Sequence, residues 1–179
     1  IQSADMVDRQ LDGIVVNQLA VALFAHRAFL VEGPTDSSVF YGVGDRIAAG
    51  SLEAAGVSIV PVGGKTSIPL VHAILTSIGV PTYALFDADA GFEERAIANG
   101  KSPEKIDNER LSHVAANRML LKYFGRPEED FPASTVSEAF AIFEDHLEAF
   151  LSDNWPEWVA ACNEVEAATG IRLSKNQLA

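Results

Sequence analysis

Two short apolar runs in this chain end abruptly at carboxylates. LVEGPTD places Glu32 and Asp36 after one run, and ALFDADAG places Asp87 and Asp89 after another. If each run is a strand of a parallel α/β sheet, its carboxyl end lies at the edge where such sheets bind ligands. Four carboxylates at one edge repel each other unless a cation neutralises them, and such oxygen ligands suit Mg²⁺, Mn²⁺ or Ca²⁺. The alternative is that Asp36 and Asp89 are helix or turn caps and Glu32 a solvated loop acid.

The elements that would position these acids alternate between strand and helix. Nearly continuous apolar runs predict strands at Arg27–Val31, Val57–Val62 and Tyr83–Phe86. Helical periodicity predicts an amphipathic helix from about Asp5 to Ala25, a helix capped by Thr35 or Asp36 that ends near Gly50, and a helix from Thr66 to Ile78. This order indicates a parallel sheet covered by helices on both faces.

The pattern changes after the second acidic run. Charged helices are predicted at Phe92–Asn99 and Pro103–Phe124, the next strand at Ala139–Phe143, and a last helix at Trp155–Thr169. Residues 92–131 are therefore expected to form a helical insertion between two strands of one sheet. The predicted fold class is α/β, a parallel sheet flanked by helices with a helical insertion.

The segment GGKTS follows the second predicted strand and is similar to half of a phosphate-binding loop. A complete P-loop has a glycine five positions before Gly64, where this chain has Ile59, so nucleotide hydrolysis by this element is rejected. A strand, two glycines and a helix N-terminus can still bind a backbone phosphate through the amide of Gly64 and the ammonium of Lys65. The alternative is a simple tight turn.

A third apolar run also meets acids, in the segment FEDHLEAF. It contains Glu144, Asp145 and Glu148. A run of acids is usually a solvated helix face, but its place after a strand favours one of them as a further metal ligand. His146 is interpreted as a bystander because the other ligands are all oxygen, and His113 is assigned no role.

Charge and cysteine content limit the classes of partner. A formal charge of −12 over 179 residues, taken alone, argues against nucleic acid. Carboxylates that hold metal count in this sum but not in the loaded site, and a missing domain could carry the basic surface. The single Cys162 fits a reducing, cytoplasmic compartment and is interpreted as a packing residue; no apolar stretch is long enough to span a membrane. The first residue is Ile1 rather than Met, which suggests a fragment of a longer protein.

The VEG and DAD segments resemble the two signatures of TOPRIM domains, the Mg²⁺-binding fold shared by topoisomerases, DnaG-type primases and several nucleases. The longer strings VEGPTD and FDADAG are most similar to the OLD (overcoming lysogenization defect) nucleases, and the resemblance covers the chain from about Phe29 to Phe150. In that family an ABC-type ATPase domain precedes the TOPRIM domain. The resemblance therefore implies that residues 1–26 are a helix or linker to a missing ATPase domain and that residues 27–179 are the TOPRIM domain.

The resemblance also implies an activity, the metal-dependent cleavage of DNA as an endonuclease or nickase. Two Mg²⁺ or Mn²⁺ ions, about 4 Å apart, would clamp the attacking and leaving oxygens. Glu32 and Asp36 would hold one ion, and Asp87 would bridge or hold the second. Asp89 and Glu148 would support them.

Two lysines are candidates for stabilising the transition state. A lysine near the C-terminus assists cleavage in the OLD family, and Lys175 is its candidate here, with Lys65 as the second choice. The family's DLE-like element reads DHLE in this chain, so Glu148 is the acid carried over and the match of Asp145 stays open. Glu32, Asp87 and Lys175 are thus the predicted catalytic residues.

Two other functions remain open from the sequence. One is a non-catalytic Mg²⁺-binding assembly module whose acids are structural. The other is a haloacid-dehalogenase-type phosphatase, which would need its DxD on the first strand, whereas here a βαβα unit precedes it. The expected partners are DNA, the ATPase domain and, through the apolar first helix, a second copy in a homodimer.

Overall fold

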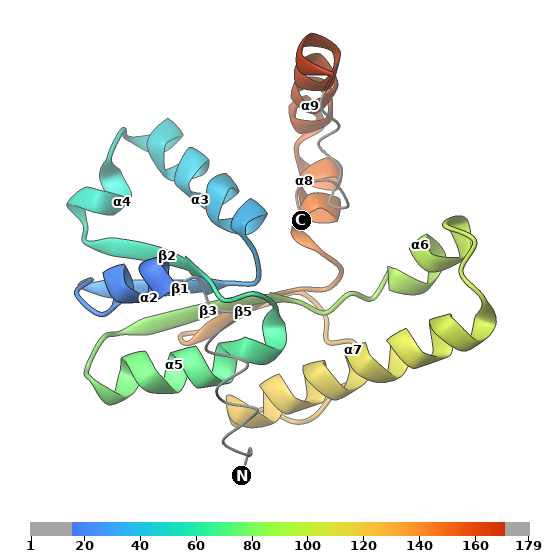
Figure 1. The fold of residues 1–179 in the computed structure, drawn as a ribbon, viewed down its shortest axis with the longest axis horizontal. Helices are drawn as coiled ribbons and strands as arrows, with labels where there is room; N and C mark the ends of the chain where they lie inside the picture. Colours follow the sequence, from blue (N-terminus) through green and yellow to red (C-terminus); the bar gives the residue numbers. More distant parts are fainter. Residues whose placement is uncertain (1–15, 171–179) are drawn as a thin grey trace.

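The computed structural model describes residues 16–170 and contains one five-stranded sheet with the strand order β2-β1-β3-β5-β4 (Figure 1). The strands are β1 (Arg27–Val31), β2 (Val57–Pro61), β3 (Thr82–Asp87), β4 (Thr135–Val136) and β5 (Phe140–Phe143). Neighbouring strands pair in parallel except at one edge, where β4 pairs antiparallel with β5. The predicted α/β fold with a parallel sheet is confirmed, with this one antiparallel edge added.

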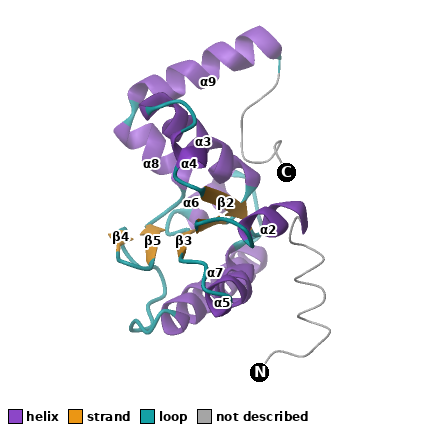
Figure 2. Cartoon of the chain, turned by 90° about the vertical axis from the view of Figure 1, so that its left-hand side faces the viewer, coloured by secondary structure: helices purple, strands orange, loops and turns teal. Residues whose placement is uncertain are grey.

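Helices cover both faces of the sheet. The described helices are α2 (Val16–Ala22), α3 (Pro34–Ile47), α4 (Ser51–Ala54), the 3₁₀ turn η1 (Lys65–Ser67), α5 (Ile68–Ser77), α6 (Phe92–Ala98), α7 (Pro103–Tyr123), α8 (Leu147–Asn154) and α9 (Pro156–Thr169). Figures 1 and 2 show α5 and α7 on one face and α3 and α4 on the other, with α8 and α9 on the side of α3. The chain leaves β3 through α6 and α7 and returns to its neighbour β5, so these two helices lie between adjacent strands, like the expected insertion.

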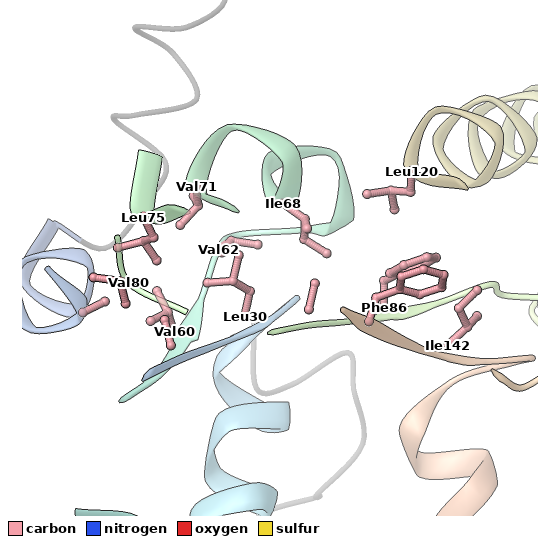
Figure 3. Packing of buried hydrophobic residues seen from close by; sticks show 14 of the residues in the cluster. Leu30, Val60, Val62, Ile68, Val71, Leu75, Val80, Phe86, Leu120 and Ile142 are labelled. Carbon is pink, nitrogen blue, oxygen red and sulfur yellow. The ribbon is translucent and has the colours of Figure 1, made fainter. Parts of the chain in front are cut away.

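The larger core lies between the sheet and the layer of α5 and α7. Figure 3 shows Ile68, Val71 and Leu75 of α5 directed at the sheet, and Leu120 of α7 beside Phe86 of β3. All five of these side chains are fully buried. A smaller cluster on the other face joins the strands to α3 and α4. The strands are apolar on both faces for this reason, as expected for a parallel sheet covered on two sides.

All four predicted strands and most of the predicted helices are found close to their expected bounds, and the differences have local causes. Strand β4 has two residues and α4 has one turn, so neither is long enough to show a periodic pattern. Helix α8 was missed because its acids were interpreted as candidate ligands at a strand end. Leu147 and Leu151 are nevertheless buried at helical spacing. The predicted helix at Asp5–Ala25 is described only as α2, and its earlier part lies outside the described residues.

The N-terminus of α3 also differs from the prediction. The N-cap residue is Gly33, not Thr35 or Asp36, and Pro34 begins the helix. Proline is well suited to the first helical position because its missing N–H has no helical partner there. Asp36 still serves the cap, since its carboxylate accepts the Gly33 N–H from the third helical position.

Within residues 16–170, none of the helices combines the length and the apolar character that a membrane crossing requires.

Candidate functional site

The first acids of the two motifs meet at the carboxyl ends of β1 and β3. These strands are parallel neighbours, so their ends fall at the same edge of the sheet. Oε1 of Glu32 accepts the backbone N–H of Asp87 at 2.8 Å. The carbonyl of Glu32 accepts the N–H of Gly64 at 2.9 Å. Glu32 therefore ties together the ends of three strands, and Asp87, the last residue of β3, is buried there.

Asp36 lies in the first turn of α3, directly after β1. Its Oδ2 accepts the Gly33 N–H at 2.8 Å, and the residue is buried. A negative charge at this position is stabilised by the unpaired amides and the dipole of the helix N-terminus. The helix thus holds the Asp36 carboxylate beside the turn that follows Glu32, and it fills the capping role weighed as the alternative for this acid.

Asp89 has a different environment from Asp87, although only one residue separates them. Its Oδ2 lies 2.7 Å from Nζ of Lys65 and 3.0 Å from Nδ1 of His113, and its Oδ1 lies 3.9 Å from Arg95. Burial raises the pKa of this carboxyl, but the hydrogen bond from His113 and the charge of Lys65 outweigh it, so the pKa falls well below its usual range. Its backbone is left-handed, with φ of 59°, a conformation that aspartate tolerates better than most residues.

The Lys65 side chain is directed into the protein. Its ammonium donates to the carbonyl of Asp87 at 2.7 Å, to Asp89 at 2.7 Å and to Oδ1 of Asn117 at 3.0 Å. The amide of Asn117 donates in turn to the carbonyls of Ala88 and Asp130. The amide of Gly64 is already bonded to Glu32. The GGK turn is thus connected to the sheet edge, and phosphate binding by Gly64 and Lys65 stays a prediction.

The acids of the third strand end divide between two places. Asp145 accepts the Gly91 N–H at 3.1 Å and forms an ion pair with Arg95. A Cβ at Gly91 would lie 2.7 Å from the Asp145 carboxylate, so a larger residue there would require this side chain to shift. Glu148 lies in the first turn of α8 with both carboxylate oxygens buried. Lys175 lies outside the described residues.

Sequence reasoning missed the contribution of the helical insertion. His113 and Asn117 project from α7, and Arg95 projects from α6, towards the end of β3. The sequence assigned no role to His113, whose ring nitrogen lies 3.0 Å from Asp89. No local pattern identifies these residues, because they have contacts that join distant positions of the chain. Asn117 lies 29 positions from Ala88 and 52 from Lys65, and Arg95 lies 50 from Asp145.

An apolar groove of about 540 Å³ lies between α3 and the pair α8 and α9. Its lining includes Glu148, Trp155, Trp158 and Cys162. Arg46 of α3 stacks on the ring of Trp155, 5.5 Å from its centre. Burial, followed by the charge of a nearby glutamate, raises the pKa of Cys162, which disfavours the thiolate and fits a packing role.

The donor chemistry of the edge can be compared with the needs of a divalent ion. Glu32, Asp36 and Asp87 offer carboxylate oxygens, the ligands that Mg²⁺ and Mn²⁺ prefer. In the part of the chain that the structure describes, however, no group of three or more acidic, histidine or cysteine side chains is arranged to hold a metal ion. The residue types fit a hard cation, and the assignments of Glu32, Asp36, Asp87, Asp89 and Glu148 as ligands stay predictions.

Comparison with known proteins locates the resemblance on this edge. Residues 23–89 match the family model described as "Overcoming lysogenization defect protein-like, TOPRIM domain". A stretch of 67 residues is 36% identical to the Old nuclease of Escherichia phage P2 and covers 37% of this chain. The similarity to the TOPRIM domain of OLD proteins is thereby confirmed over β1, β2, β3 and the two acidic motifs, and the α/β fold agrees with it.

The aligned stretch spans only 11% of the phage nuclease, so most of that protein has no counterpart in the comparison. No solved structure matches this chain.

Proposed function

We propose that this chain is the catalytic domain of a metal-dependent DNA endonuclease or nickase of the OLD type. The observation that carries the proposal is the bond between Glu32 and the main chain of Asp87, which joins the two motif acids at one sheet edge. Both acids fall inside the segment that matches the TOPRIM family model. The Old nuclease of Escherichia phage P2 is a relative of this chain. Fold alone would not support an activity, so the weight rests on these residues.

Mg²⁺ or Mn²⁺ at this edge would be held by Glu32, Asp36 and Asp87, with Glu148 as a further candidate. Such ions, one or two in number, activate a water molecule and stabilise charge on the phosphate when bound. The protein contributes fixed positions: Glu32 is held by two strand ends, and Asp36 by a helix N-terminus. Fixed ligands reduce the reorganisation needed when charge develops in the transition state.

DNA binding requires positive charge, and ion pairs offset much of the positive charge of the helical insertion. Its basic side chains are largely paired with acids, in the pairs Arg95–Asp145, Lys101–Glu109, Arg110–Glu93, Arg118–Asp130 and Lys122–Glu128. We therefore assign DNA affinity to the metal-loaded edge, and to the ABC-type ATPase domain to which residues 1–26 are proposed to lead or to a second copy in a homodimer.

A non-catalytic Mg²⁺-binding module is the second candidate. It is favoured by the engagement of Asp36 in the α3 cap and of Asp89 with basic side chains. The haloacid-dehalogenase alternative has no such support, because the DxD follows β3, the central strand, and not the first strand of the chain.

A plasmid assay separates these candidates. The purified chain should convert supercoiled plasmid to the nicked form with Mn²⁺ or Mg²⁺, and EDTA should abolish the conversion. Asp87→Asn serves as the control for a contaminating nuclease, since it keeps the shape of the edge. Cleavage that survives in EDTA, or that Asp87→Asn leaves unchanged, would refute the metal-dependent mechanism. Binding of Mg²⁺ without cleavage would support the assembly module.

A further inference from the structure

The Lys65 ammonium occupies a cage made of oxygen atoms at the end of β3. Its three acceptors are the Asp87 carbonyl, the Asp89 carboxylate and the Asn117 side-chain carbonyl, at 2.7, 2.7 and 3.0 Å. An ammonium has three N–H donors, so each is used once. The Lys65 side chain is only 9% exposed. A charged group at this depth is stable only when it is paired and hydrogen-bonded, as it is here.

The cage is rigid because its members are held from several directions. Asn117 is fully buried and its amide donates to the carbonyls of Ala88 and Asp130, which fixes its oxygen towards Lys65. The Asp89 N–H donates to the carbonyl of Asp145 at 3.0 Å. The cage thus connects η1, the end of β3, α7 and the segment after β5.

We propose that Lys65 is the resident cation of the second motif acid. Its ammonium neutralises Asp89 and, through the carbonyl of Asp87, fixes the main chain that carries the first acid. Lys65 is thereby a positioning residue and not a phosphate ligand. The divalent ion would then be bound by Glu32, Asp36 and Asp87, and this part of the inference rests on the proposed function.

The chemistry of the two acids supports this division. A metal ion bound by Asp89 would have to compete with the buried ammonium at 2.7 Å and with His113 at 3.0 Å on the same oxygen. Displacing the ammonium would leave a desolvated charge without its acceptors, which is strongly unfavourable. The bond from Lys65 to Asp87 is made to the main-chain carbonyl of Asp87, at 2.7 Å.

The pairing can be tested without metal by NMR of lysine ammonium groups. In metal-free protein, Lys65 should give a slowly exchanging ¹⁵N ammonium signal, because all three N–H groups are bonded and shielded from water. Lys65→Met should remove this signal, and Asp89→Asn should broaden or shift it. Lys101→Met is the matched control, since that ammonium is partly exposed and pairs with Glu109 outside the cage. A spectrum without a slowly exchanging ammonium would overturn the proposal.

The division of the acids is tested by Mg²⁺ titration of the full 179-residue chain, followed by calorimetry and by the same NMR signal. Asp89→Asn should bind Mg²⁺ within about threefold of the unaltered protein, whereas Asp87→Asn should lose at least tenfold, the equivalent of about 1.4 kcal/mol. The ammonium signal should persist at saturating Mg²⁺. Equal losses in the two variants, or disappearance of the signal on Mg²⁺ addition, would show that Asp89 is a ligand and refute the proposal.

Failure of the proposed function gives a different result. If the unaltered chain binds no Mg²⁺ and cuts no plasmid, the nuclease proposal falls, while the ammonium signal in metal-free protein still decides whether Lys65 is the partner of Asp89. If Lys65→Met does not fold, Asp89→Asn carries the test alone, because an amide keeps the volume of the carboxylate.

Discussion

Replacing Glu32 in two different ways should separate its structural contact from its charge. The side chain accepts the Asp87 N–H at 2.8 Å, and Asp87 is buried. Glu32→Ala removes the acceptor and leaves this N–H without it, a loss of about 1–3 kcal/mol. Glu32→Gln keeps an acceptor oxygen but removes the negative charge. The two variants should therefore both lose cleavage, and only the alanine variant should lose stability.

The expected size of the effect follows from the length of the chain. For a domain of 150–250 residues, each kcal/mol shifts Tm by about 2–4 °C, so a central loss of about 2 kcal/mol for Glu32→Ala corresponds to roughly 4–8 °C in EDTA. Glu32→Gln should melt at or slightly above the unaltered protein, because it relieves repulsion among Glu32, Asp36 and Asp87. Glu104→Gln, an exposed position in α7, controls for the change of net charge.

The assay combines thermal unfolding in EDTA with Mn²⁺-dependent plasmid nicking, and circular dichroism confirms that each variant is folded. Cleavage by Glu32→Gln at the unaltered rate would refute the assignment of Glu32 as a ligand. An equal fall in Tm for both variants would refute the reasoning about the hydrogen bond, since it would show that the charge itself stabilises the edge.

Three further predictions follow from the described contacts and the proposed chemistry. Because the pKa of Asp89 is depressed below its usual 3.8, its contribution to stability is fully present above that value and is lost as pH falls towards the folded-state pKa. The difference in unfolding free energy between the unaltered protein and Asp89→Asn, measured by urea unfolding, should therefore shrink below about pH 4. A difference that stays constant with pH would argue against the ion pair. Gly44→Ala should lower stability by about 1–3 kcal/mol, because its Cβ would lie 2.6 Å from Leu52. Gly42→Ala in the same helix meets nothing within 4 Å and should raise stability by up to about 1 kcal/mol. The reverse order of the two variants in thermal unfolding would contradict the packing of α3. Lys175→Ala should slow single-turnover cleavage about a hundredfold, for about 3 kcal/mol in the barrier, with little change in DNA affinity, and a parallel loss of affinity would make it only a backbone contact.

The sequence predicted those parts of the fold that depend on local patterns. The strands around residues 27–31, 57–61 and 82–87 are apolar on both faces, and this pattern survives in any parallel sheet. The adjacency of Glu32 and Asp87 followed from the general rule that parallel strands end at one edge. The two-residue strand β4 and the single turn α4 carry no period and could not be found this way.

The environment of each acid could not be predicted, because it depends on residues distant in the chain. The sequence placed Asp87 and Asp89 at one strand end as metal ligands, with Asp89 in a supporting role. The strand ends at Asp87, and the left-handed backbone at Asp89 turns its carboxylate towards Lys65 and towards His113 of the insertion. The environment of Asp89 thus depends on α7 of the insertion, which the motif itself does not reveal.

The Lys65 ammonium lowers the negative charge of the proposed metal edge by pairing with Asp89. With Asp89 neutralised by Lys65, the carboxylates left at the edge are Glu32, Asp36 and Asp87, a formal charge of about −3, which one divalent ion reduces to about −1. A second divalent ion would make this edge positive unless another anion joins it, either Glu148 or a phosphate of the DNA itself. A phosphate is the stronger choice, since it brings its own charge and oxygen ligands to the place where cleavage occurs. A two-ion mechanism in this protein would therefore complete its metal site with the substrate.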